Sequence, residues 1–303
     1  KIVYKETLQV YTSPQPTLLY DRVYNADTDS TEIKFGSKAG LLKKKQDAIE
    51  GNTISNRSVI AAFGISNVEK SKLNLVYEMF SNHIAPAMLP TNSLMGFIKR
   101  NLRDRKNDKM KMFILHFLKA SDFNISDISI HDEEIKINSD MEAFIRNAPS
   151  MSDKEKNEII QKGIIKKDEL FFTHHTTNGD IELDEELESM GTKRYMGLAT
   201  ILYDLLARGV FLPIDEIETS IHYELLSYFI RVFLVNSKKH SQLIMTTHDI
   251  NLLDENYIRR DTIWFTDKND CGETQLLRLS SLGLHKTISV YNAYKQEKLV
   301  DLP

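Results

Sequence analysis

The apolar positions of the chain change their spacing twice: from the period of a strand to that of a helix, and then to an alternation of the two. The first 40 residues are predicted to be β-rich, with strands at 1–12, 17–24 and 31–35. A polar, turn-rich segment at 25–30 separates the last two strands. We therefore expect residues 1–40 to form one β-rich portion of the molecule.

Residues 41 to about 120 follow the helical period. Ser66 and Glu69 match the S-x-x-E pattern of a capping box, which predicts a helix start at this place. The helix that follows carries a stripe of apolar residues, for which we expect core or helix–helix packing. The stripe consists of Val68, Leu75, Val76, Met79, Phe80 and Ile84.

The segment 121–130 returns to strand or turn, and a charged segment follows it at 131–170. Ser152 and Glu155 form a second capping box in this charged segment. We interpret 131–170 as a helical insertion or linker, so the whole stretch 41–170 is expected to form a helical subdomain.

From residue 171 onward, strands alternate with helices. Elements in this order are typical of an α/β layer with a largely parallel sheet. Gly209 follows the first of these helices and is a plausible C-terminal cap. The predicted strands are 180–183, 210–214, 242–247, 262–266 and 275–279, and the predicted helices are 192–207 and 221–235.

The composition fits a globular protein with a real core, because 41% of the residues are apolar and 27% are charged. The formal net charge is −4, from 39 Lys and Arg against 43 Asp and Glu, which excludes a generally basic nucleic-acid binder. Cys271 is the single cysteine, so an internal disulfide is excluded and a reducing, cytoplasmic location is expected. The sequence contains no run of about 18 apolar residues, so it predicts no membrane-spanning segment.

Residues 99–111 form a local basic run. A contact with a nucleic-acid backbone would explain such a run, and so would a solvated helix face. We keep both interpretations open. The basic side chains are Lys99, Arg100, Arg103, Arg105, Lys106, Lys109 and Lys111, against Asp104 and Asp108.

Three short polar motifs lie at element boundaries in the last third of the chain. The first, E-S-M-G-T-K-R, begins a predicted helix, where unpaired N–H groups and a partial positive charge attract anions. Gly191 lets an anion approach the backbone, Ser189 and Thr192 add hydroxyls, and Lys193 and Arg194 add positive charge. This pattern predicts a phosphate site. Alternatively, Ser189 only caps the helix.

The second motif places Asp215 and Glu216 directly after the apolar strand 210–214. The carboxyl ends of such strands are where α/β proteins bind ligands. One carboxylate suits Mg²⁺, and the other suits the orientation or deprotonation of a water molecule. Alternatively, both are solvated acids at a strand end. Pro213 is unfavourable in a central strand.

The third motif is T-T-H-D, which follows the next apolar strand and contains His248. A histidine at the end of a buried strand can contact a γ-phosphate or position a water molecule. A structural histidine is the alternative.

The order of these motifs resembles that of ABC-type ATPases, which carry a signature motif, a Walker B strand with a catalytic glutamate, a D-loop and a switch histidine. The match runs from Glu188 to Trp264. The forms E-S-x-G-T-x-R, D-E-x-E-x-S-x-H and T-T-H-D, with the continuation R-R-D-T-I-W-F, resemble the RloA/AbiL-like branch of bacterial restriction and abortive-infection proteins, which is related to the overcoming-lysogenization-defect (OLD) ATPases. The N-terminal half resembles this branch more weakly.

The resemblance implies an α/β fold with an ABC/RecA-like P-loop ATPase core, in which helices flank a mostly parallel sheet. Residues 171–303 would form this core, with 1–40 as the β-rich part of the lobe and 41–170 as the helical insertion. ATP and Mg²⁺ are the implied cofactors. The resemblance assigns Mg²⁺ to Asp215, the base or water-orienting role to Glu216, and contact with the γ-phosphate to His248.

The implied site is composite. Ser189 and Gly191, with Thr192 and Arg194 in the same motif, would bind the γ-phosphate of a nucleotide held by the opposite subunit, and Ser220 would belong to the D-loop at that interface. The implied assembly is an ATP sandwich, a homodimer or a higher oligomer. It would be the sensor or motor of an anti-phage system with a separate protein effector.

One element of the family pattern is missing from the sequence. None of the 12 glycines is followed by lysine, so the chain has no G-x-x-x-x-G-K-[ST] phosphate loop. In the family this Walker A loop lies upstream of all the motifs above. We therefore expect the chain to begin inside the β-subdomain that follows the loop, and to bind ATP poorly and hydrolyse almost none by itself.

Two other functions remain open. A DNA-associated ATPase of the SMC or repair kind would carry a long coiled coil, for which 41–170 lacks a sustained heptad pattern. A catalytically incomplete regulatory or scaffold module would explain the missing loop, but the retained Glu216 and His248 oppose it.

Overall fold

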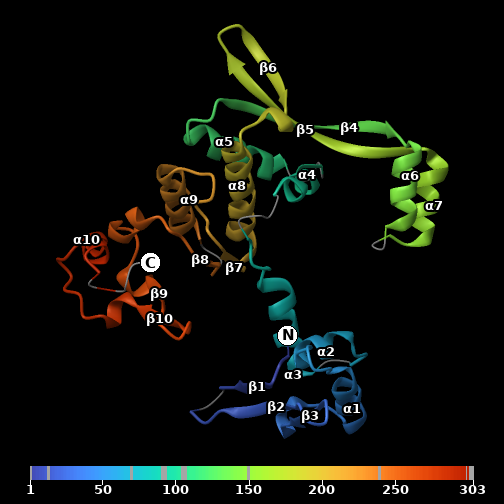
Figure 1. Ribbon diagram of the computed structural model, residues 1–303, viewed down its shortest axis with the longest axis vertical. Coiled ribbons are helices and arrows are strands. Elements are labelled where there is room, and N and C mark those ends of the chain that lie inside the picture. The colour runs from blue at the N-terminus through green and yellow to red at the C-terminus, as the bar shows by residue number, and fades with distance from the viewer. Residues whose placement is uncertain are drawn as a thin grey trace. The chain divides into compact units, whose positions relative to one another are not determined.

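The computed structural model describes two compact units, one formed by residues 1–86 with 210–212 and one by 87–209 with 213–303 (Figure 1). No helix in the part of the chain it describes combines the length and the apolar character needed to cross a membrane. The described residues are 2–11, 14–68, 71–89, 94–103, 108–148, 151–237, 240–297 and 299.

The first unit begins with an antiparallel sheet in the order β1-β2-β3. Tyr20 in the middle strand lies opposite Leu8 on one side and Phe35 on the other. The three predicted strands are confirmed, because the pattern of apolar positions already has the period of a strand. Their bounds are β1 (Lys5–Val10), β2 (Thr17–Asn25) and β3 (Ser30–Phe35).

Three short helices pack on this sheet and complete the core of the first unit. They are α1 (Lys43–Asn52), α2 (Val59–Ile65) and α3 (Lys72–Glu78), which continues into a π-helical turn at Met79–His83. The buried core consists of Leu19, Tyr20, Ile33, Ile49, Val59, Ile60, Ala62, Phe63 and Leu73.

The capping box predicted at Ser66 is wrong. Ser66 ends α2 instead, because its N–H bonds to the carbonyls of Ala62 and Phe63 and its hydroxyl donates to Ala62. The next helix starts after Ser71, whose hydroxyl accepts the N–H of Leu73. Glu69, the other half of the predicted box, lies outside the described residues.

The predicted apolar stripe of this region is buried only in part. Val68 and Val76 pack against the core of the first unit, as expected. Leu75, Met79 and Phe80 are 73%, 50% and 52% exposed, so the prediction of core packing is wrong for them. Leu75 of α3, and Met79 and Phe80 of the π-helical turn, therefore lie outside the core that Val68 and Val76 help to cover.

Gly36 follows β3 at a close approach of two backbone segments. A Cβ atom at this position would lie 2.0 Å from the carbonyl oxygen of Leu18 in β2. We expect Gly36→Ala to lower the free energy of unfolding of this unit by about 1–3 kcal/mol, because β2 is paired on both sides and cannot move away. Urea unfolding measures the change. Gly51→Ala in α1 is the control, since no atom lies within 4 Å of the added methyl, and equal midpoints for the two variants would contradict the close approach.

The second unit contains a long antiparallel sheet in the order β4-β5-β6. Figure 1 shows α6 and α7 at the end of the β4–β5 pair that lies away from α8. The segment 131–170, expected to be a helical insertion or linker, therefore contains two helices and also parts of the strands β4 and β5. The bounds are β4 (Ile125–Lys136), α6 (Ser139–Asn147), α7 (Asp153–Lys162), β5 (Ile164–Thr176) and β6 (Gly179–Asp184).

Two local predictions for the second unit are confirmed. The capping box of Ser152 and Glu155 starts α7, with both of its reciprocal hydrogen bonds present. Gly209 ends α8 (Met190–Arg208) in the left-handed conformation, at φ 68°.

Helix α8 is the centre of the second unit and is buried along most of its length. The ring of Tyr195 in α8 stacks on the ring of Phe117 in α5 (Asp108–Ala120), with 5.0 Å between the ring centroids. The hydroxyl group of Tyr195 lies 2.7 Å from Ser121 Oγ. The other elements are α4 (Met95–Arg103), β7 (Phe211–Ile214), α9 (Tyr223–Asn236), β8 (Gln242–Met245), β9 (Trp264–Lys268), β10 (Thr274–Arg278) and α10 (Val290–Lys295).

Parallel pairing occurs around β7. The strand forms a two-stranded sheet with β8 and two isolated parallel bridges, Ile84 to Phe211 and Met88 to Ile214. Pro213 lies between the two bridged residues of β7 and has no N–H to donate, so a continuous ladder cannot form there. The β9–β10 pair is antiparallel. The described residues thus form mixed sheets and helices, and a mostly parallel core stays a prediction.

Candidate functional site

The signature-like motif forms the first turn of α8, as the sequence predicted. Ser189 is the N-cap: its hydroxyl accepts the N–H of Thr192 at 3.0 Å and lies 2.8 Å from the hydroxyl of Thr192. A cap of this kind uses one N–H group, and the first turn of a helix carries several. The cap role is therefore real and does not by itself prevent an anion from binding at this terminus.

Gly191 brings the start of α8 against the segment that contains Ser220. A Cβ atom on Gly191 would lie 2.9 Å from the carbonyl oxygen of Ser220, closer than real Cβ atoms come. Ser220 itself has a positive φ of 64°. The structure therefore brings together two predicted site residues that are 29 positions apart.

Arg194 is a buried charged residue in the first half of α8. It is 7% exposed, and its Nε, Nη1 and Nη2 atoms have no hydrogen-bond partner among the described residues. Burial lowers the pKa of this guanidinium. An unpaired charge in a protein interior is costly, so the site suits an anion supplied from outside the described chain.

The helical repeat places Arg194 between two tight contacts. It is three residues after Gly191 and three before Gly197, so all three share one face of α8. A Cβ on Gly197 would lie 2.2 Å from a side-chain atom of Leu94, beside the start of α4. Arg194 thus lies on α8 between its contact with Ser220 and its contact with Leu94.

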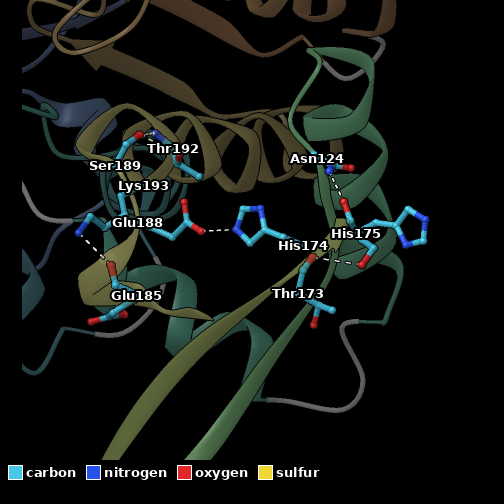
Figure 2. A network of polar contacts seen from close by, with 10 residues as sticks. Asn124, Thr173, His174, His175, Glu185, Glu188, Ser189, Thr192 and Lys193 are labelled. Atoms are coloured by element: carbon cyan, nitrogen blue, oxygen red, sulfur yellow. Dashed lines mark hydrogen bonds and ion pairs between the residues drawn. The ribbon is translucent and has the colours of Figure 1, made fainter. Parts of the chain in front are cut away.

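The residues just before α8 are fixed by two further contacts (Figure 2). Lys193 Nζ donates to the carbonyl of Glu185 at 2.9 Å. His174 Nε2, near the end of β5, bonds to Oε1 of Glu188. No sequence signal pointed to His174, because its partner lies 14 residues away across β6.

Asp215 and Glu216 lie at the end of β7, and Thr246 connects them. The hydroxyl of Thr246 donates to Asp215 Oδ1 at 2.5 Å and accepts the backbone N–H of Glu216 at 2.9 Å. Glu216 has a φ of 43°, in the left-handed region that non-glycine residues avoid, and such strain is concentrated at functional sites. The sequence placed Thr246 in a motif but did not predict this bridging role.

His248 completes this group. Its Nε2 atom lies 4.0 Å from Oε1 of Glu216, and its side chain is 85% exposed. Its backbone N–H donates to Glu218 Oε1 at 2.8 Å, while the buried Oε2 of Glu218 has no partner among the described residues. Asp215, Glu216 and His248 therefore lie close together, and Glu218 is an additional residue that fixes the histidine loop.

The residues present suit Mg²⁺ and phosphate. No cluster of three or more His, Cys, Asp or Glu side chains that could hold a metal exists among the described residues. Mg²⁺ needs no such cluster, because it commonly takes one or two carboxylates together with phosphate oxygens and water. In such a site Asp215 would hold the ion, and the α8 terminus with Arg194 would supply positive charge to a phosphate.

Three of the seven basic side chains in the run 99–111 form ion pairs in the part of the chain that the structure describes. This pairing favours the interpretation as a structural helix face over a nucleic-acid contact, although residues 104–107 lie outside the described part of the chain. The pairs are Lys99 with Glu185 at 2.9 Å, Arg103 with Asp168 at 3.2 Å and Asp132 at 3.5 Å, and Lys111 with Asp127 at 2.6 Å.

One protein-family profile matches residues 17–254, and its description is "AAA domain, putative AbiEii toxin, Type IV TA system". No curated protein matches the chain. Among solved structures, an Smc head bound to the C-winged helix domain of ScpA is 14% identical, with a TM-score of 0.43, and the match covers 96% of this chain and 76% of that one.

Two further solved structures are similar at the same low level. The SMC head domain from Thermotoga maritima is 12% identical, with a TM-score of 0.38 and coverage of 90% and 73%. An Smc head domain with a coiled coil and joint from Pyrococcus yayanosii is 16% identical, with a TM-score of 0.37 and coverage of 80% and 39%.

Proposed function

The chain belongs to this AAA-domain family of ATPase-type proteins, and we propose that it is the ATP-binding and ATP-hydrolysing part of an ABC-type ATPase. The observation that carries the proposal is that the Thr246 hydroxyl bonds to both Asp215 and Glu216, while His248 Nε2 lies 4.0 Å from the Glu216 carboxylate. Carboxylates at the end of a strand, with a histidine beside them, suit hydrolysis of a phosphoanhydride.

Each residue has a distinct role in this proposal. Mg²⁺ bound through Asp215 would neutralise charge on the phosphates. Glu216 orients the attacking water and accepts its proton as the new P–O bond forms and the bond to ADP breaks. His248 contacts the γ-phosphate. The first turn of α8, with Ser189, Gly191, Thr192 and Arg194, and the D-loop residue Ser220 complete the site of a second subunit.

The cellular role that we propose is defence against phage. The family description names a toxin of a toxin–antitoxin system, and the motifs resemble those of abortive-infection ATPases. We propose that the protein works in the cytoplasm as a dimer or higher oligomer formed through the shared nucleotide. It would act as sensor or motor for a separate protein effector.

Binding of ATP with Mg²⁺ to the full-length natural protein tests the proposal. Gly191→Ala should weaken binding about tenfold, the equivalent of ~1.4 kcal/mol, because the added methyl displaces the Ser220 carbonyl. Gly96→Ala in α4 is the control, since no atom lies within 4 Å of its new methyl. Absence of ATP binding by the unmodified protein would refute the proposed function, and equal affinities of the two variants would remove Gly191 from the site.

A further inference from the structure

The start of α8 has a carboxylate next to it that should disturb an anion site. Glu188 directly precedes the N-cap Ser189, and its side chain is only 6% exposed. A carboxylate in this position is attracted to the N–H groups of the first turn and to the positive end of the helix. It would therefore compete with an incoming phosphate and repel it at short range.

His174 binds this carboxylate from another element. Because an ionised carboxylate only accepts hydrogen bonds, Nε2 of His174 carries the proton that is donated to Oε1 of Glu188. Figure 2 shows the two side chains pointing at one another, and the contact between them is the hydrogen bond from His174 to Glu188. The pair is sheltered, since the His174 side chain is 24% exposed.

The backbone of His174 is held on both sides. It pairs with Ile125 of β4 and with Ile181 of β6, so the imidazole projects from a strand inside a three-stranded sheet. The amide of Asn124 also donates to the carbonyl of the neighbouring His175. A donor on such a fixed base keeps a defined position.

The nearby cationic side chains do not bind the Glu188 carboxylate in the described part of the chain. Lys193 donates to the carbonyl of Glu185, and Lys99 forms an ion pair with the Glu185 carboxylate at 2.9 Å. Arg194 has no partner among the described residues. Within the part of the chain that the structure describes, the Glu188 carboxylate has His174 as its hydrogen-bond partner.

We infer that His174 is a positioning residue that holds the Glu188 carboxylate away from the first turn of α8 and keeps this terminus available to a phosphate. The inference rests on the proposed nucleotide role of Ser189 and Gly191. It adds a residue from β5, outside all three sequence motifs, and explains why a buried glutamate is compatible with an anion site.

The first arm of the test measures ATP affinity of the full-length protein in the presence of Mg²⁺. His174→Phe keeps a ring and removes the donor, and should weaken binding about fivefold. Adding Glu188→Gln to this variant should restore the affinity, because the competing charge is gone. His175→Phe is the control, since its imidazole bonds to the exposed Asp180 at 2.7 Å rather than to Glu188.

The second arm contains no nucleotide and so separates the inference from the proposed function. Amide hydrogen exchange is measured at residues 190–192, which should exchange more slowly in His174→Phe as the freed carboxylate binds them. His174→Gln, which retains a donor, and Glu188→Gln alone should both show the same amide exchange at residues 190–192 as the unmodified protein. These two variants provide the answer if His174→Phe folds poorly.

The outcomes separate cleanly. Slower exchange in His174→Phe in a protein that binds no ATP would support the inference and refute the proposed function. Unchanged exchange in this variant would overturn the inference. A loss of affinity that Glu188→Gln fails to reverse would also overturn it, since His174 would then act only on the fold.

Discussion

Glu216→Gln is expected to leave ATP binding by the full-length protein intact and to lower its turnover by at least about 100-fold. The substitution keeps the size of the side chain and removes the only group at this position that can accept a proton from water. The backbone anchor is unaffected, because the N–H of residue 216 donates to Thr246 through the main chain. The defect should therefore lie in the chemical step and not in binding.

Steady-state turnover with Mg²⁺ and equilibrium binding, measured on the same preparation, check this expectation. Glu224→Gln is the matched control, because it makes the same change at an exposed position at the start of α9. Turnover of the Glu216 variant at the unmodified rate would mean that another group activates the water. A loss of binding equal to the loss of turnover would assign Glu216 to the binding of nucleotide.

Arg194→Met is expected to have two effects of opposite sign. Without nucleotide the variant should be more stable by about 1 kcal/mol or more, because a buried charge without a partner is replaced by an apolar side chain of similar length. With ATP the variant should gain little stability, since the positive charge available to the phosphate is gone. A residue that served only packing would not combine these two results.

Thermal unfolding of the full-length protein with and without ATP and Mg²⁺ measures both effects, because a ligand that binds only the folded state raises its stability. Arg208→Met is the control on the same helix, since Arg208 lies in the last turn and pairs with Asp204 at 3.2 Å. Destabilisation of the nucleotide-free Arg194 variant would show that the guanidinium has a structural partner. Full stabilisation of it by ATP would remove Arg194 from the site.

Local signals predicted the elements that carry the site. Ser189 and Gly209 mark the start and the end of α8, as expected. Both caps depend on hydrogen bonds between residues a few positions apart, which local sequence can predict. The same reasoning succeeded for the Ser152 and Glu155 box and failed for Ser66. An S-x-x-E pattern is compatible with a cap, but a preceding helix can extend to the same serine and use it as its end.

The sequence by itself also determined the order of the polar motifs and their places at the ends of strands and the start of a helix. It could not show that Thr246 joins Asp215 to Glu216. It could not show that Leu75 and Phe80 face outward either, because a stripe of apolar residues reports the period of a helix and not what covers its face.

The tertiary structure alone decided the partners of the charged side chains near α8. His174 binds Glu188 because β5 and β6 bring the end of one strand beside the loop before the helix. The guanidinium of Arg194 is buried without a hydrogen-bond partner among the described residues. Backbone hydrogen bonds and periodicity are local and can be read from neighbouring residues. The cost or benefit of a buried charge depends on groups distant in sequence, which only the folded chain places around it.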